Sequence, residues 1–135
     1  MAVYALTSEY TALNAGDLSA HLKSSVLTVD VAALDTTDFA SAGWTEVIVG
    51  LKSGTLALNF QDDVVAASID SILWPLLGTV VTFEVRATSS AVGTSNPKYT
   101  GSVLITGATI GGGVGELAMK SLSFPTSGAV TRATA

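Results

Sequence analysis

The sequence contains no cysteine and has few charged residues. The lack of cysteine excludes a disulfide framework, a thiolate nucleophile and a cysteine-ligated metal. Only 13% of the 135 residues are Asp, Glu, Lys or Arg, and 48% are hydrophobic, whereas about a quarter of a typical soluble domain is charged. A surface with so little charge is typical of one that other protein subunits cover. We therefore expect self-assembly.

Long apolar runs and an excess of basic charge are also missing. The longest apolar stretch, Ile72–Val81, contains Pro75 and Gly78 and is about half of the ~20 residues that a membrane helix needs. Residues Met1–Tyr10 have no basic residue and no apolar block, so we expect no secretory signal. Six basic and 11 acidic residues give a net charge of −5, which disfavours tight binding of nucleic acid through its phosphates.

The chain length and the periodicity predict one β-rich domain spanning residues 1–135. Apolar and polar residues alternate in Ser53–Gln61 and again in Thr79–Ala87, as in half-buried strands. Segments rich in Val, Ile, Leu and Thr predict five more strands: Ser25–Ala32, Thr45–Leu51, Tyr99–Thr109, Glu116–Phe124 and Ala129–Thr134. Seven or eight strands indicate a mainly β fold, a two-sheet sandwich or barrel.

One segment, Val64–Leu77, has helical spacing of its apolar residues. Asp62 or Asp63 would cap its first turn, and Pro75 and Gly78 would end it. We expect this α-helix to flank the sandwich with its apolar stripe inward and with Trp74 in the core. The stripe consists of Val65, Ile69, Ile72, Leu73 and Leu76.

Two predicted loops are unusual. Ala33–Gly43 is too long for a tight hairpin, and it places Phe39 in polar surroundings with Trp44 just after it. Gly107–Gly115 has five glycines in nine residues and can approach another backbone closely. We expect the aromatic side chains of the first loop to dock on another surface.

The sequence predicts no catalytic residue, no metal site and no cofactor. His21 lies near Ser24 and Ser25, but no acid is placed to orient its ring and no nucleophile elbow is present. The pair Asp62-Asp63, and the loop acids Asp30, Asp35 and Asp38, lack the spacing of a calcium loop. The glycine run lacks the lysine of a phosphate-binding loop.

Several short motifs occur in a recognisable order: Asp35-Thr36-Thr37-Asp38-Phe39, Gly50-Leu51-Lys52-Ser53-Gly54-Thr55-Leu56, Leu76-Leu77-Gly78-Thr79, Asn96-Pro97-Lys98-Tyr99-Thr100-Gly101, Gly112-Gly113-Val114-Gly115-Glu116 and Thr126-Ser127-Gly128-Ala129-Val130-Thr131-Arg132. In this order, from about Asp35 to Thr134, the chain resembles the major tail tube proteins of long-tailed, siphovirus-type bacteriophages.

The resemblance implies a structural, non-enzymatic virion protein with a β-sandwich and one flanking helix. Its subunits would form hexameric rings, and the rings would stack into a hollow tail tube through which the genome passes without specific binding. The implied partners are other copies of the chain, a tape-measure protein, a tail terminator and baseplate or tail-tip proteins. The implied location is the virion tail, assembled in the host cytoplasm.

The resemblance also suggests which residues meet other subunits. The loop Ala33–Gly43 would reach a neighbouring subunit or the next ring, and the glycine run would approach another backbone. The candidate contacts are Asp35, Thr36, Thr37, Asp38, Phe39, Trp44, Gly111, Gly112 and Gly113. An acidic bore would repel DNA phosphates, and Glu84, with Asp30 or Glu46, is the candidate lining.

A second interpretation stays open at this point. The chain could be a phage decoration or baseplate domain, or a carbohydrate-binding β-sandwich module. Phe39, Trp44 and Trp74 would then supply aromatic faces on which a sugar ring can stack.

Overall fold

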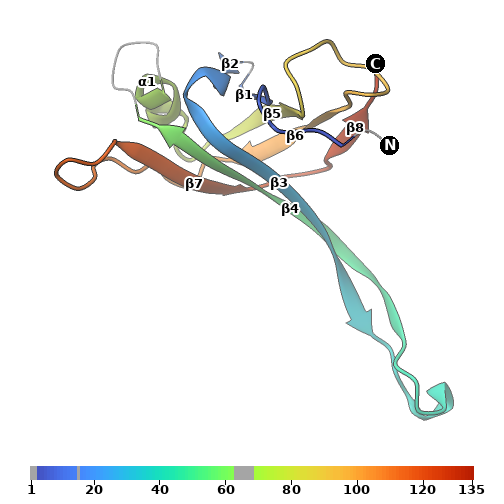
Figure 1. Ribbon diagram of the computed structural model, residues 1–135. Coiled ribbons are helices and arrows are strands. Elements are labelled where there is room, and N and C mark those ends of the chain that lie inside the picture. Colours follow the sequence, from blue (N-terminus) through green and yellow to red (C-terminus); the bar gives the residue numbers. More distant parts are fainter. Residues whose placement is uncertain (1–2, 15, 63–68) are drawn as a thin grey trace.

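The computed structural model describes residues 3–14, 16–62 and 69–135 (Figure 1). Within them, eight strands form two antiparallel sheets, one of five strands in the order β2-β1-β5-β6-β8 and one of three in the order β3-β4-β7. The strands are β1 Tyr10–Leu13, β2 Gly16–Asp17, β3 Leu22–Asp35, β4 Val47–Gln61, β5 Val80–Arg86, β6 Lys98–Leu104, β7 Met119–Pro125 and β8 Thr131–Ala133. The expected two-sheet, mainly β fold is confirmed, and the described strands do not close into a barrel.

The core lies between the two sheets. Alternate residues of β4 point inward because successive side chains of a strand point to opposite faces. They meet Phe83 of β5, Val103 of β6 and the inward residues of β7. The fully or nearly fully buried members are Leu13, Leu18, Leu56, Leu58, Phe60, Ile69, Leu73, Val81, Phe83, Val103, Ile105, Leu122 and Phe124.

Short helical segments complete the fold: α1 Ile69–Leu73 and three 3-10 turns, η1 Ser19–His21, η2 Phe39–Ser41 and η3 Trp74–Leu76. Ile69 and Leu73 are buried, so the inward stripe is confirmed for these two residues. The α-helix ends at Leu73, four residues before the predicted end, because Pro75 has no backbone N–H and the chain tightens into η3. Trp74 is exposed rather than buried, so its expected place in the core was wrong. No helix among the described residues is long and apolar enough to cross a membrane.

Asp62, one of the two predicted helix caps, lies beside Lys120, and the first-turn backbone amides that it would cap lie outside the described residues. The carboxylate oxygen Oδ1 of Asp62 lies 3.6 Å from Lys120 Nζ, and its backbone N–H donates to the carbonyl of Ala118. The alternative cap Asp63, and Val64 and Val65 of the predicted helix, lie outside the described residues.

The long strands differ most from the prediction. The two segments Thr45–Leu51 and Ser53–Gln61 form one 15-residue strand, β4, and β3 continues through Asp35 into the predicted loop. Together they form a hairpin that projects far beyond the sandwich (Figure 1). Three other strands are shorter than expected, since β6 ends at Leu104, β7 begins only at Met119 and β8 spans only Thr131–Ala133. Strands β1 and β2, in the N-terminal region, were not predicted.

A β-bulge lies in β4 near the base of the projecting part. Val31 pairs with Lys52 and Ala33 pairs with Val49, so Gly50 and Leu51 of β4 lie opposite the single residue Ala32. A Cβ atom on Gly50 would stand 3.1 Å from Ala32 Cβ and 3.2 Å from Leu34 Cγ, so a side chain there would have to push these neighbours away. Glycine therefore suits the close approach of the two strands, and the bulge bends the hairpin.

Lys120 is the one fully buried charged side chain among the described residues. Its ammonium group lies 3.6 Å from the carboxylates of both Asp62 and Asp70, and it donates to the carbonyl of Thr109. One cation thus connects the end of β4, the start of α1, the loop after β6 and β7. A buried ammonium is tolerated because it is paired and hydrogen-bonded.

We predict that Lys120→Met destabilises the fold by about 3 kcal/mol, because the buried carboxylate of Asp62 loses its cation. Lys23→Met is the matched control, since Lys23 is exposed and its loss should change stability little. Urea unfolding at neutral pH measures both variants. Equal midpoints for the two would show that the buried ion cluster contributes no stability.

Candidate assembly interface

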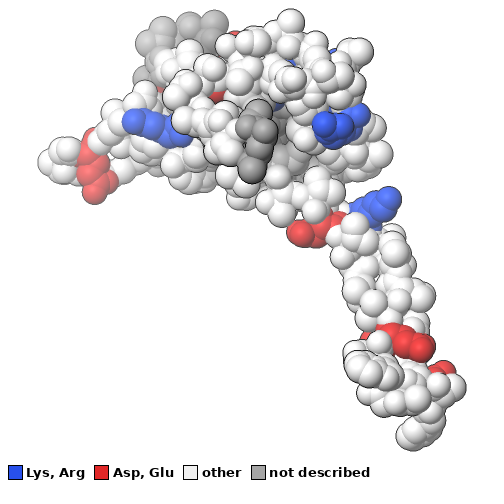
Figure 2. All heavy atoms as spheres, turned by 45° about the vertical axis from the view of Figure 1, so that its right-hand side comes forward, with Lys and Arg blue, Asp and Glu red and all other residues white. Residues whose placement is uncertain are grey.

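The projecting hairpin, residues 30–52, is called the arm. It is rich in apolar side chains that its own chain does not cover, with more than half of each exposed. Figure 2 shows an arm surface of mostly uncharged residues with few charged groups. An apolar surface of this extent is typical of an interaction site. The exposed apolar residues of the arm are Val31, Leu34, Phe39, Trp44, Val47, Ile48, Val49 and Leu51.

The arm tip, residues 36–46, is held by its own hydrogen bonds. Asp38 caps the turn η2: its Oδ1 accepts from Ala40 N–H at 2.9 Å, and Ser41 Oγ accepts from Asp38 N–H at 3.1 Å. Ala42 adopts a positive φ of 54°, a conformation rare for residues other than glycine. Such a locally determined turn presents its side chains in a fixed direction.

Further bonds close the base of the tip. Asp35 Oδ1 accepts from Thr37 N–H at 2.8 Å, and hydrogen bonds from the Thr37 side chain and backbone hold the pKa of Asp35 below its ordinary value. Thr37 Oγ1 in turn accepts from Glu46 N–H at 2.8 Å, and Thr36 N–H donates to the Glu46 carbonyl. The predicted contact residues Asp35, Thr36, Thr37 and Asp38 therefore build the tip, and hold Phe39 and Trp44 outward.

Phe39 and Trp44 are the most prominent side chains of the tip. Phe39 is 107% exposed and Trp44 is 78% exposed. They do not dock on the body of their own chain. If they dock at all, as we expect from the sequence, they dock on another molecule. Burying an aromatic side chain contributes about 1.5–3 kcal/mol, which makes these two residues the strongest candidate anchors.

The other predicted contact region is the glycine-rich segment 106–118, here called the hook. Gly111, Gly112 and Gly113 lie in it, and Gly111 has a positive φ of 113°. Gly113 N–H donates to Glu116 Oε2 at 3.1 Å, and a Cβ on Gly113 would stand only 2.9 Å from that carboxylate. The hook is thus a turn closed by Glu116, and a side chain at residue 113 would have to displace that carboxylate.

The three acidic candidates do not lie together. Glu84 is on the outer face of β5, 3.7 Å from Arg86 and 4.0 Å from Lys98. Asp30, exposed and paired with Ser53, is on the outer face of the opposite sheet. Glu46 belongs to the arm tip. Because Glu84 and Asp30 lie on opposite outer faces of the sandwich, they cannot form one acidic patch.

Among the described residues, both edges of the three-stranded sheet are unpaired along most of their length. β3 pairs with β4 on one side, and β7 pairs with β4 on the other. Unpaired strand edges of this length readily accept another strand. The sequence predicted strands in both regions, but it did not predict that β3 and β7 would be the edge strands of this sheet.

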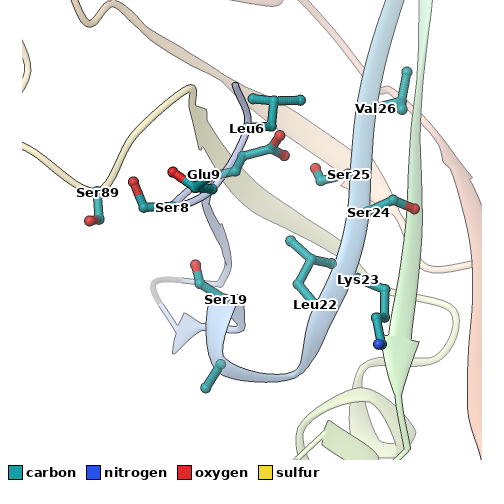
Figure 3. Close-up of a pocket in the computed structure, with 12 residues that line it drawn as sticks. Leu6, Ser8, Glu9, Ser19, Leu22, Lys23, Ser24, Ser25, Val26 and Ser89 are labelled. Atoms are coloured by element: carbon teal, nitrogen blue, oxygen red, sulfur yellow. The ribbon is translucent and has the colours of Figure 1, made fainter. Parts of the chain in front are cut away.

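A hollow of about 460 Å³ lies between the N-terminal segment and the start of β3 (Figure 3). Five serine side chains and Glu9 line it, and Ser25 Oγ accepts from Thr11 Oγ1 at 3.1 Å. His21 is in η1, just before β3, and Ser24 and Ser25 follow in β3. Ser25 is engaged by Thr11 and by Glu9 rather than arranged as a nucleophile.

Several residues of the arm were missed as contact candidates by the sequence analysis. Val31 and Val47–Val49 were assigned to ordinary strands, and Leu34 was placed in the loop Ala33–Gly43 without being named as a contact. The signal was present in the continuous apolar run Val47-Ile48-Val49, because a strand with one wet face should alternate.

Comparisons with known proteins give similar folds among solved structures. A chain of the virion of a native gene transfer agent particle has a TM-score of 0.73 and 18% sequence identity, over 93% of this chain and 95% of that chain. A chain of the tail of an empty gene transfer agent particle with C6 symmetry has a TM-score of 0.65 and 18% identity, over 82% and 81%. No family model and no curated protein matches the chain. At this identity the likeness establishes the fold.

Glu9 provides a pH-dependent prediction. Burial raises the pKa of Glu9 above its ordinary value, although a hydrogen bond from Ser25 opposes the shift. The unfolded chain therefore ionises first as the pH rises, and this group lowers stability once the pH passes the ordinary pKa of a glutamate. We predict that Glu9→Gln is more stable than the unmodified chain at neutral pH, and that the difference shrinks below pH 4.

Thermal unfolding between pH 3.5 and 8 measures this difference. Asp17→Asn is the control, because Asp17 is an exposed acid close in the chain. A constant difference between Glu9→Gln and the unmodified chain across the pH range would contradict the assignment to burial of Glu9.

Proposed function

We propose that this chain is a major tail tube subunit, a structural virion protein that polymerises into stacked hexameric rings around a hollow conduit for genome delivery. The observation that supports it most directly is the arm. Its apolar residues and rigid aromatic tip stay in water in the single chain, and only another subunit can bury them. The proposal assigns the chain no catalytic role.

The similar solved structures support the same function. Both are chains of gene transfer agent particles, and one belongs to a tail with C6 symmetry. The resemblance carried by the sequence motifs implies the same kind of assembly, a tail built from rings of subunits. On this basis the subunits would form six-membered rings in a virion tail, assembled in the host cytoplasm. A tape-measure protein, a tail terminator and baseplate or tail-tip proteins would be its partners.

Ring closure would use the edges of the three-stranded sheet. If β3 of one copy pairs with β7 of the next, the sheet continues from subunit to subunit, and the contact is head-to-tail. A head-to-tail contact closes into a ring when its rotation divides a full turn. The closed ring leaves neither edge exposed, which removes the need for charged residues that protect an edge.

The wall of the bore would be the outer face of β3, β4 and β7. The outward residues that pair across these strands are hydroxyl, amide or apolar, and the one charged residue among them is Asp30. They are Ser24, Val26, Thr28, Asp30, Ser53, Thr55, Ala57, Asn59, Gln61, Met119, Ser121, Ser123 and Pro125. The exposed Lys23 lies in a β3 bulge at one end of this face. A face with a single peripheral cation holds DNA phosphates weakly.

The outer face of the five-stranded sheet fits the bore less well. There Glu84 is accompanied by Arg86 and Lys98, so that two cations and one anion leave a net charge of +1 around it. Positive charge would retain DNA by release of counterions. Of the acidic candidates for the bore, Asp30 is therefore favoured over Glu84 and Glu46.

The first test is assembly of the purified chain. We predict that the concentrated protein forms hollow rods or rings visible by negative-stain electron microscopy. Replacing both tip aromatics (Phe39→Ser with Trp44→Ser) should abolish them, and should change monomer stability by less than about 0.5 kcal/mol because both side chains are exposed.

Trp74→Ser is the matched control, since Trp74 is an exposed aromatic on the body, and it should leave assembly intact. A protein that remains monomeric or trimeric at all concentrations and binds glycans through Phe39 or Trp44 would favour the carbohydrate-binding alternative.

The second test distinguishes the two outer faces. We predict that Asp30→Lys slows DNA release from particles that contain it, whereas Glu84→Lys leaves the release rate close to normal. The reason is that only the first would place new positive charge in the bore. Time courses of DNA release, with tube assembly checked by microscopy, measure the effect. The reverse order of the two variants would assign the bore to the five-stranded sheet.

A further inference from the structure

The arm tip and the hook lie at opposite ends of the same sheet. At one end β4 begins, where Val47 pairs with Asp35 just before the tip. At the other end β4 finishes, where Gln61 pairs with Met119 just after the hook. Figure 1 shows the arm leaving one side of the sandwich, and the loop that precedes β7 leaving the other. β4 has 15 residues, so the two ends are separated by roughly 50 Å along the strand.

The hook carries an apolar surface of its own. Ile110, Val114 and Leu117 are exposed, and Val114 is 108% exposed. The hook is also fastened at both sides: Lys120 donates to the Thr109 carbonyl before these residues, and Asp62 N–H donates to the Ala118 carbonyl after them. A fixed turn that presents aliphatic side chains is suited to receive aromatic ones.

Two copies could meet tip to tip or tip to hook, and charge favours the second contact. Residues 35–46 contain Asp35, Asp38 and Glu46 and no Lys or Arg, so contact between two tips would bring three negative charges against three. The hook contains one charged residue, Glu116, and its carboxylate already accepts from Gly113 N–H. Contact between a tip and a hook therefore meets much weaker repulsion.

We infer that the hook of one copy is the receptor for the arm tip of another, so that Phe39 and Trp44 pack on Ile110, Val114 and Leu117. This inference depends on the proposed function, and assigns the contact by which successive rings are joined. The two surfaces differ and lie at opposite ends of one direction, so the contact is head-to-tail and repeats without limit along that direction. Each ring then offers free tips on one side and free hooks on the other.

Cysteine cross-linking tests the contact, because the natural chain has no cysteine to give a background. Phe39→Cys and Val114→Cys are the probes, since both side chains are fully exposed in the single chain. A short bis-maleimide applied to tubes assembled from a mixture of the two variants should give covalent dimers. Each variant alone should give none, and the double variant should give a ladder of higher oligomers.

The matched control is Phe39→Cys mixed with Ser90→Cys, which places the second thiol on an exposed loop of the body. This pair should give no dimers. Cross-linking of Phe39→Cys to itself would show that tips meet tips, and would overturn the inference. So would tubes in which the pair Phe39→Cys and Val114→Cys fails to react.

The inference and the proposed function can fail separately. Microscopy reports whether tubes form, whereas cross-linking of the two mixed variants in concentrated solution reports the pairwise contact even without tubes. If the cysteine variants fail to assemble, hydrogen–deuterium exchange on the unmodified chain replaces them. Assembly should then slow exchange in residues 36–46 and in 110–117 together, and slowing in the tip alone would overturn the assignment of the hook.

Discussion

The structure depends on one constraint: two strands of this chain extend beyond the core that could bury them. An isolated two-stranded hairpin is marginally stable in water, and here both faces carry apolar side chains. The arm keeps its shape because its strands continue into the three-stranded sheet, because the bulge at Ala32 and Gly50 interlocks them, and because η2 caps the tip. Its apolar surface remains uncovered, and this follows directly from the length of β3 and β4.

Several of the few charged residues form contacts within the chain itself. Lys120 is buried between Asp62 and Asp70, and Arg86 lies between Glu84 and the ring of Tyr10, whose centroid is 4.1 Å from the guanidinium carbon. Lys98 also lies beside Glu84. Three of the six basic residues therefore form ion pairs within the chain. In the arm the charged residues lie at the base (Asp30, Lys52) and at or next to the tip (Asp35, Asp38, Glu46), and the strand segments between them, residues 31–34 and 47–51, have none. These uncharged segments favour burial by another subunit.

The sequence predicted the fold class well because period-two alternation is a local property. The predicted strand Thr79–Ala87 lies within one residue of β5 at each end, and Ser53–Gln61 ends where β4 ends. Errors arose where tertiary context decided the outcome. One strand was expected to end at Leu51 and another to begin at Ser53, but in the structure both belong to β4, in which Gly50 lets Ala32 approach. Trp74 was expected in the core, but the turn at Pro75 directs it to solvent.

The candidate contact surface was partly predictable for a similar reason. Phe39 and Trp44 stood out as aromatics in a polar loop, and the glycine run stood out by composition. Nothing local indicated that the strands on either side of the loop would leave the sandwich. That property depends on how far β7 reaches along β4. Its last pair is Pro125 with Thr55, and Thr126 N–H then donates to the Gly54 carbonyl. Among the described residues, β4 before Gly54 has β3 as its one partner strand.

The same asymmetry of β4 has a mechanical consequence for an assembly in which tips are held by neighbouring subunits. Tension applied at the tip passes along β4, whose second half is bonded to β3 on one side and to β7 on the other. Antiparallel hydrogen bonds run perpendicular to the strands, so tension along β4 loads the seven pairs with β7 together rather than one after another. The strand that carries the arm is thus also the strand most firmly anchored in the body, and the hook follows at its far end. An arm formed by two edge strands would lack this anchorage, whereas here one of its two strands, β4, is both the longest strand and the central one.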